Sequence, residues 1–177
     1  MFALLVIDML NDFVKPDGAL PVPGAEDIVE NINKLIKDFQ GNDDLVVFVN
    51  DAHEVDDPEF MTFPLLCVKG TPGAHIYPKI IGNRNIIEKT TYSAFAETNL
   101  DDYLIENQVE CIFLCGVATD ICLKAAAEGA LVRNYHVTII EDASRGLTKQ
   151  AHVSALEDML RLGVDIKMTR DILCVSE

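Results

Sequence analysis

A short segment of the sequence places a cysteine where its sulfur could act as a nucleophile. Residues 116–122, Gly-Val-Ala-Thr-Asp-Ile-Cys, follow an apolar run and lead into a helical pattern, so Cys122 falls in the first turn of a helix after a strand. The unpaired amides and the positive dipole end of such a turn favour a thiolate. Because a thiolate attacks carbonyl carbon, the expected chemistry is acyl transfer with Cys122 as the nucleophile.

Two further ionisable side chains follow strand-like runs elsewhere in the chain. Asp8 comes at the end of the first apolar run, and Lys89 comes at the end of a short run that begins at Asn85. In open parallel sheets, ligands bind beyond the carboxyl ends of the strands. There a carboxylate could accept the thiol proton, and an ammonium could stabilise the resulting charges. The sequence therefore predicts a site made of Asp8, Lys89 and Cys122.

Alternating strand-length and helix-length patterns are expected to position these side chains. Six buried or short strands are expected, at 3–9, 45–50, 85–89, 110–115, 137–141 and 164–168. Apolar residues at helical spacing predict helices at 25–39, 97–107, 119–133 and 149–162. The proline-rich stretch 51–83 is expected to be irregular but ordered. This order predicts an α/β fold with three layers, a parallel sheet between helices, in a single domain spanning residues 1–177.

Composition narrows the class of ligand. The chain has 177 residues, is 49% hydrophobic and carries a formal charge of −15. Nucleic acids and anionic membranes need a Lys/Arg footprint, so a neutral or cationic small molecule is the expected partner. The first residues lack the basic start of a signal peptide, and no apolar run reaches the length of a membrane span. Five cysteines without a Cys-x-x-Cys pair indicate a reduced, cytoplasmic protein.

Three segments of the sequence resemble the signatures of a known enzyme family. They are Ile-Asp-Met-x-Asn-Asp-Phe at 7–13, Glu-Lys-Thr-x-Tyr-Ser-Ala-Phe at 88–95, and the segment 116–122. Together with Cys-Val-Lys-Gly-Thr-Pro-Gly at 67–73, they are similar to the isochorismatase-like cysteine hydrolases, and most similar to nicotinamidases and related amidases. The resemblance extends over nearly the whole chain, with the segments in the order that the family shows.

The resemblance implies an architecture and a mechanism. It implies six parallel strands in the order 3-2-1-4-5-6 and a cis peptide bond between Val117 and Ala118. Asp8 would take the Cys122 proton while Lys89 stabilises the charged pair and lowers the thiol pKa. The amides of Ala118 and Cys122 would form an oxyanion hole. The expected activity is hydrolysis of a small-molecule amide C–N bond through a thioester, with release of ammonia, in a homodimer or tetramer.

The segments also supply candidates for the substrate pocket. Phe13 and Tyr92 could contact a substrate ring, and an ordinary core position is an equally good interpretation of each aromatic residue. His152 falls on a late helix and is expected to be structural.

The chain departs from the family at one metal-ligand position. Related nicotinamidases bind a divalent metal through an Asp-x-His pair, an acidic residue and a further histidine. Asp51, His53 and Glu59 match the first three, whereas Leu66 stands at the position of the last. The three matching residues are candidate ligands for zinc, and they also suit manganese or iron. His75 is a weaker candidate to complete the site, and the alternative for His53 is a loop histidine hydrogen-bonded to Asp51.

Leu66 leaves other functions open. An activity like that of N-carbamoylsarcosine amidase, on ureido compounds, uses the same three catalytic residues on a substrate without a ring, and Leu66 favours it. Isochorismatase proper cleaves a vinyl ether without a cysteine nucleophile, and its anionic substrate fits poorly with a charge of −15. A catalytically silent homologue that binds a ligand or acts as a scaffold is a further alternative, against which the retained catalytic residues argue.

Overall fold

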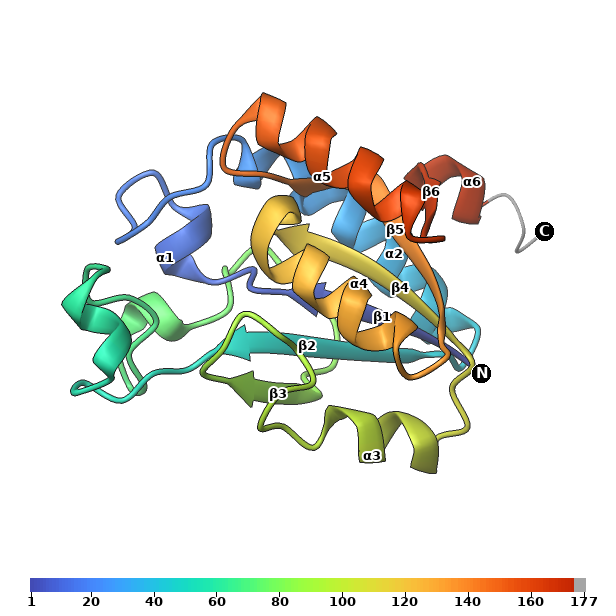
Figure 1. Ribbon diagram of the computed structural model, residues 1–177, viewed down its shortest axis with the longest axis horizontal. Helices are drawn as coiled ribbons and strands as arrows, with labels where there is room; N and C mark the ends of the chain where they lie inside the picture. Colours follow the sequence, from blue (N-terminus) through green and yellow to red (C-terminus); the bar gives the residue numbers. More distant parts are fainter. Residues whose placement is uncertain (174–177) are drawn as a thin grey trace.

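The computed structural model describes residues 1–173, and its centre is a six-stranded sheet (Figure 1). The strands are β1 (Phe2–Ile7), β2 (Leu45–Asp51), β3 (Ile86–Lys89), β4 (Cys111–Val117), β5 (His136–Arg145) and β6 (Asp165–Lys167). They lie in the order β3-β2-β1-β4-β5-β6, and every adjacent pair is parallel. The predicted fold class and strand order are confirmed. Cys174, one of the five cysteines, lies outside the described residues.

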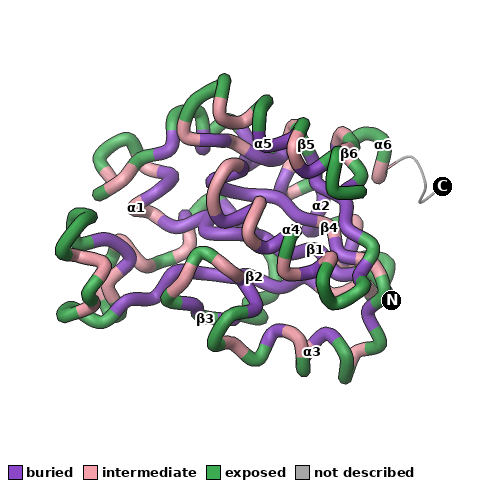
Figure 2. The backbone as a smooth tube through the Cα atoms, in the orientation of Figure 1, coloured by how far each residue is buried: buried purple, intermediate pink, exposed green. Residues whose placement is uncertain are grey.

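Helices cover both faces of the sheet and complete three layers. One face carries α3 (Leu100–Glu106), α4 (Lys124–Leu131) and α5 (Lys149–Arg161), whereas the other carries α1 (Asn11–Val14), η1 (Ala25–Ile28) and α2 (Val29–Gly41), with α6 (Thr169–Leu173) against α2. Successive side chains of a strand point to opposite faces of the sheet. In β1, Leu5 and Ile7 pack on the face covered by α3, α4 and α5, whereas Leu4 and Val6 pack on the face covered by α1 and α2. The inner strands β1, β2, β4 and β5 are accordingly buried along most of their length, whereas the edge strands β3 and β6 are partly exposed (Figure 2). Among the described residues, every helix is too short or too polar to cross a bilayer.

The boundaries predicted from sequence differ most at β5. The expected strand ended at residue 141, whereas β5 continues to Arg145. The pairing with β4 shifts register between Leu114 and Gly116 and then resumes, with Gly116 opposite Ser144. Polar residues after the irregularity hid this second half of the strand. Because β5 extends to Arg145, β4 continues alongside it to Val117, two residues beyond its predicted end. This added pairing holds in place the backbone that leads to Cys122.

The helix predicted at 119–133 begins with a wider turn. Residues 119–123 form a π-type turn (η4, Thr119–Leu123), in which the Leu123 amide donates to the Ala118 carbonyl at 3.1 Å, and α4 then runs to Leu131. Such five-residue turns are rare and occur often at functional sites. The short elements α1 and α6 were not predicted, because four or five residues are too few for a helical period.

The long stretch after β2 is irregular, as predicted, and it is anchored to the start of the chain. It contains two short 3₁₀ turns, η2 (Pro58–Met61) and η3 (Pro72–Ala74). The Asn11 amide donates to the His75 carbonyl at 2.9 Å, and the Cys67 amide donates to the Asp12 carboxylate at 2.7 Å. These bonds hold the stretch beside the carboxyl ends of β1 and β2.

Candidate active site

The ends of β1 and β4 bring Asp8 and the Cys122 turn together at the point where the strand order reverses. Gly116 lies opposite Ile7 with a φ of 114°, and a Cβ there would come within 2.1 Å of the Ile7 carbonyl oxygen. Only glycine permits this approach. Asp8 itself has a φ of 51°, a conformation that aspartate tolerates better than most residues. The backbone therefore turns sharply so that the Asp8 carboxylate faces the site.

The three predicted catalytic side chains lie in one buried cluster. Lys89 Nζ is 2.9 Å from Asp8 Oδ2 and 3.7 Å from Cys122 Sγ, and it also contacts the Asp51 carboxylate. The second Asp8 oxygen accepts the Asp51 amide N–H at 2.8 Å. The carboxylate oxygens of Asp8 and Asp51 and the Cys122 sulfur lie within 4.8 Å of one another. Asp51, predicted only as a metal ligand, thus also belongs to the cluster around Lys89.

The charges of the cluster follow from its burial. Burial and the charge of Asp51 raise the pKa of Asp8 to about 6, although Lys89 opposes them. Burial opposes the charge on Lys89, but Asp8, Cys122 and Asp51 together raise its pKa well above the ordinary value. Burial and the Asp8 charge raise the pKa of Cys122, and Lys89 offsets them only in part. Burial and the Asp8 charge therefore oppose the thiolate that the helix terminus favours, and the sulfur lies beside a carboxylate that can accept its proton.

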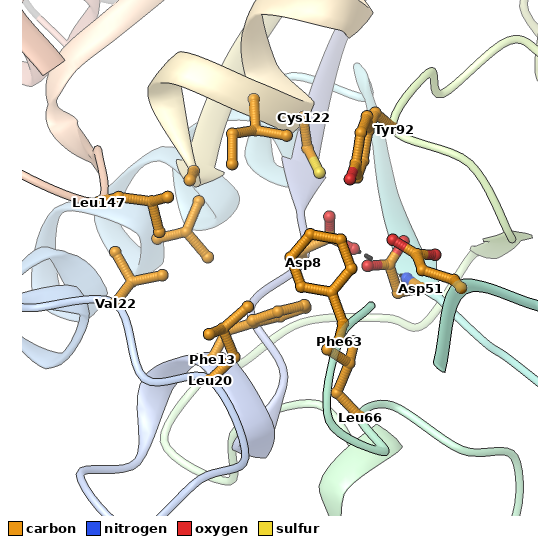
Figure 3. A pocket seen from close by; sticks show the side chains of 14 residues that line it. Asp8, Phe13, Leu20, Val22, Asp51, Phe63, Leu66, Tyr92, Cys122 and Leu147 are labelled. Atoms are coloured by element: carbon orange, nitrogen blue, oxygen red, sulfur yellow. Dashed lines mark hydrogen bonds between the residues drawn. The ribbon is translucent and has the colours of Figure 1, made fainter. Parts of the chain in front are cut away.

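The Cys122 sulfur points into a cavity of about 60 Å³ (Figure 3). The described residues that line it are Asp8, Phe13, Leu20, Val22, Asp51, Glu59, Phe63, Leu66, Tyr92, Val117, Ala118, Ile121, Cys122 and Leu147. Phe13 is buried and Tyr92 is 48% exposed, and both predicted pocket residues reach the cavity. The peptide bond between Val117 and Ala118, at the wall next to the nucleophile, is cis.

Three predicted metal ligands converge beside this cavity. The buried His53 has its Nε2 atom 3.9 Å from Asp51 Oδ2 and 3.7 Å from Glu59 Oε2. These separations approach those of donors around a tetrahedral ion with bonds of about 2.1 Å. Asp51 is the main cause that raises the pKa of His53 to about 9, so a metal at Nε2 must displace a proton. The donor types suit a divalent cation, and among the described residues His53 and Glu59 also belong, with Asp57, to a group whose donor atoms all lie within 4.8 Å of one another.

Leu66 closes this side of the cavity where a further ligand would be expected. The segment that contains it runs beside His53, whose amide donates to the Cys67 carbonyl at 3.0 Å. Leu66 is buried and lines the cavity, and its side chain offers no donor atom. His75 does not complete the metal set, because it belongs to neither group of described residues whose donor atoms lie within 4.8 Å of one another. The candidate set is one imidazole and two carboxylates.

Two anchors of the site were missed in the sequence. Asp57 accepts a hydrogen bond from His53 Nδ1 at 2.9 Å and caps η2 by accepting the Glu59 amide. The signal was its position four residues after His53 and just before a proline. Asp120 accepts the Leu147 amide at 3.0 Å and so holds another cavity wall in place. His152 is structural, as expected, because its Nδ1 lies 2.8 Å from the hydroxyl of the buried Thr119.

We predict that Asp57→Asn lowers zinc affinity by about 10- to 100-fold, because a carboxylate behind a ligating imidazole fixes its tautomer and raises its basicity. Asparagine can still cap η2, so the turn should persist. Competition against a chromophoric chelator measures the affinity. Asp56→Asn, at the exposed neighbouring position, is the matched control and should bind zinc like the parent protein. Equal affinity in the Asp57 and Asp56 variants would exclude a metal at His53 Nε2.

Comparison with known proteins places this site in a family. The family model for the isochorismatase domain matches residues 2–171. The chain belongs to the isochorismatase family. An isochorismatase family protein of Bacillus subtilis (strain 168), PncA, is 38% identical over 168 residues, which cover 87% of this chain and 91% of that protein. The nicotinamidase of Escherichia coli (strain K12) is 30% identical over 188 residues, with 86% and 87% covered.

Solved structures of family members show the same fold. The pyrazinamidase of Pyrococcus horikoshii in complex with zinc superposes with a TM-score of 0.89 at 34% identity, covering 94% of this chain and 98% of that one. The N-carbamoylsarcosine amidase of Thermoplasma acidophilum superposes with a TM-score of 0.84 at 33% identity, covering 95% and 96%. The relatives of this family member therefore include amidases for ring amides and for an N-carbamoyl compound.

Proposed function

We propose that this protein is a cysteine amidohydrolase that cleaves the C–N bond of small primary amides through a thioester at Cys122, in the manner of a nicotinamidase. The observation that carries the proposal is the contact of Lys89 with both Asp8 and Cys122 at the wall of the cavity. The amidases among its relatives support the same reaction class.

The proposed reaction begins with a proton transfer. A Cys122 thiol gives its proton to the Asp8 carboxylate as the sulfur attacks the amide carbon, and the Lys89 ammonium stabilises the charge that stays on the cluster. The amide N–H groups of Ala118 and Cys122 would bind the oxyanion. Asp8 then returns its proton to the departing ammonia. Water hydrolyses the thioester, again with Asp8 as the base, and the free thiol is restored.

Asp51, His53 and Glu59 would hold a divalent ion at the edge of this cavity. When bound, the ion would supply a positive, Lewis-acidic centre beside the substrate. The remaining assignments accompany the proposal: one domain over residues 1–177, a homo-oligomer, and a reduced cytoplasmic location. Within the described residues Cys67, Cys111, Cys115 and Cys122 are free thiols, which supports the last assignment.

An N-carbamoylsarcosine amidase-like activity is the second candidate. Leu66 favours it because no histidine stands at the last ligand position, and the neighbour of that name supports it. The acidic lining of the cavity disfavours it, because N-carbamoylsarcosine carries a carboxylate. A ligand-binding homologue without activity is disfavoured by the buried ion pair between Lys89 and Asp8.

Ammonia release from nicotinamide and N-carbamoylsarcosine, measured in parallel with and without a chelator, tests the proposal. We expect turnover of nicotinamide, with kcat/KM at least about tenfold above that for the carbamoyl compound. Turnover of the carbamoyl compound alone would move the assignment to the second candidate. No ammonia from either would favour the silent homologue. Loss of nicotinamide turnover on chelation, with recovery on adding zinc, would establish that the metal is needed despite Leu66.

A further inference from the structure

A second cavity, of about 490 Å³, lies across the sheet from the catalytic cluster. The side chains of Asp51 and Lys89 reach that cluster from the carboxyl ends of β2 and β3. Because successive side chains of a strand point to opposite faces, their chain neighbours Asn50 and Glu88 point to the face that carries α1 and α2. These two residues are paired in register and both line the second cavity, which therefore lies at the edge strand of the sheet (Figure 1).

Asn50 is a buried polar residue whose side chain has no protein partner. The residue is 5% exposed, and its Oδ1 atom is buried without a hydrogen bond. Within the part of the chain that the structure describes, no residue bonds to its Nδ2 atom either. Buried amides are nearly always hydrogen-bonded, because leaving water without a new partner costs free energy. Since Asn50 lines the second cavity, a molecule bound there could supply the missing donor or acceptor.

Two side chains of opposite charge reach the same cavity without an ion pair among the described residues. The guanidinium of Arg84 lies 5.2 Å from the centroid of the Phe48 ring and donates to the Ile80 carbonyl at 2.9 Å. These contacts fix its position and leave other N–H donors available. Burial lowers the pKa of Arg84, and no carboxylate opposes that effect. Glu88 is exposed at the cavity and likewise forms neither a hydrogen bond nor a salt bridge.

The two charges are separated along the strands. Arg84 lies over Phe48, whereas Glu88 is opposite Asn50, two residues further along β2. Two residues of a strand span roughly 7 Å. An ammonium and a carboxylate joined by three methylenes can lie about 5 Å apart, whereas an α-amino acid holds them at about half that separation. The longer molecule can therefore reach both side chains through hydrogen bonds at its two ends.

The rest of the lining adds little net charge. Lys69 Nζ is held by Glu54 at 2.9 Å, and Glu54 is also the main cause that raises the pKa of Lys69, with a smaller contribution from Glu88. Asp51 borders this cavity as well, but its carboxylate contacts Lys89 on the opposite face. The other residues are small or apolar apart from one histidine: Ala52, Gly70, Ala74, His75, Ile76 and Ile86. They offer hydrocarbon to the spacer of a bound molecule.

We propose that the second cavity binds a small zwitterion, an ω-amino acid, whose carboxylate pairs with Arg84, whose ammonium pairs with Glu88, and which bonds to the Asn50 amide between them. Asp51 is the one residue that lines both this cavity and the catalytic cavity. The proposal does not depend on the amidase function. Because Asn50 and Glu88 directly precede Asp51 and Lys89, a ligand here contacts the strand ends that hold the catalytic cluster.

Four matched compounds test the class of ligand in a binding titration followed by ligand-observed NMR. They are 4-aminobutyrate, its isomer 2-aminobutyrate, butyrate, which lacks the ammonium, and butylamine, which lacks the carboxylate. We expect a Kd of about 1 mM or tighter for 4-aminobutyrate. Each of the others should bind at least about threefold more weakly, because it loses one charged contact or the spacing between them. No binding of 4-aminobutyrate at about 10 mM, or equal binding of any of the others, would overturn the proposal.

Charge variants locate the ligand. Glu88→Gln should weaken 4-aminobutyrate until it binds like butyrate, while the affinity for butyrate itself stays unchanged. Arg84→Gln should weaken both compounds by about three- to tenfold and leave butylamine unaffected. Arg170→Gln, whose side chain is 82% exposed and outside the lining, is the matched control and should bind like the parent protein. Equal binding in the Arg84 and Arg170 variants would place the ligand elsewhere and overturn the site.

Two further variants separate binding from folding and from the catalytic cavity. Asn50→Ala should weaken 4-aminobutyrate without lowering the free energy of unfolding of the unliganded protein, because the amide has no protein partner to lose. A destabilised fold with unchanged affinity would overturn the role given to Asn50. Cys122→Ala alters only the catalytic cavity and should bind 4-aminobutyrate like the parent. Weaker binding in Cys122→Ala than in Arg84→Gln would assign the ligand to the catalytic cavity and contradict a second site.

Discussion

Replacing Cys122 with alanine is expected to abolish amide hydrolysis, with kcat falling by about 10⁴- to 10⁶-fold. Losses of that size follow when the nucleophile of a coupled catalytic unit is removed. No other described thiol lines the cavity, since Cys67 and Cys115 are buried in the core and Cys111 lies at the start of β4. The measurement is ammonia release at saturating amide, compared with the parent protein.

The fold should survive this change. Cys122 is 7% exposed in a helical turn, and alanine is a good helix former of smaller volume. A urea unfolding curve close to that of the parent would show that the loss is chemical. Cys111→Ala, which removes a thiol outside the cavity, is the control and should keep its activity. Activity above trace in the Cys122 variant would contradict covalent catalysis by this sulfur.

Replacing Lys89 with methionine is expected to reduce both stability and activity. The ammonium is fully buried between Asp8 and Asp51, and methionine would leave these two carboxylates facing each other without a cation. Removing one partner of a buried ion pair costs about 3–5 kcal/mol of folding free energy. The pKa of Asp8 would rise above about 6, because Lys89 now lowers it. Asp8 would then be protonated near neutral pH and unable to act as the base, which lowers kcat by about 10²- to 10⁴-fold.

Urea unfolding and a pH profile of kcat/KM test the two effects separately. The acid limb of any remaining activity should move to higher pH, since a higher pKa of Asp8 keeps it protonated further up the scale. Adding Asp51→Asn to the methionine variant should recover part of the stability, because one of the facing charges is removed. Lys69→Met, on the surface, is the control and should change neither measurement. An unchanged free energy of unfolding in the Lys89 variant would show that the ion pairs of Lys89 with Asp8 and Asp51 do not stabilise the fold.

The fold could be predicted from sequence because its signals are local and repeated. Strands such as β1 are continuously apolar, and α2 and α5 carry apolar residues at helical spacing. The extension of β5 to Arg145 could not be predicted, since it depends on a register shift in the neighbouring strand. The wider first turn of the Cys122 helix was missed for a similar reason: hydrogen-bond registers of four and five residues leave the same local sequence pattern.

The site could be predicted in its members but not in its electrostatics. Asp8, Lys89 and Cys122 each lie at or just beyond the end of a strand, and parallel strands bring such positions to one edge. The helix terminus suggested a thiolate, whereas burial and the charge of Asp8 favour the thiol. Burial of this kind arises from residues far apart in the chain, as do the apolar walls built by Leu20 and Leu147. Asp57 was missed because its role appears only when His53 turns its Nδ1 atom toward it.

Trapping the acyl group with hydroxylamine tests the thioester at Cys122 most directly. The parent protein is supplied with the primary amide that it hydrolyses fastest, together with increasing hydroxylamine, and the hydroxamate, acid and ammonia are all measured. A thioester predicts that hydroxamate replaces the acid as hydroxylamine increases, while ammonia release does not fall, and that Cys122→Ala forms neither product. If the acid remained the sole product at every hydroxylamine concentration, water would be attacking the amide directly, and covalent catalysis by Cys122 would be contradicted.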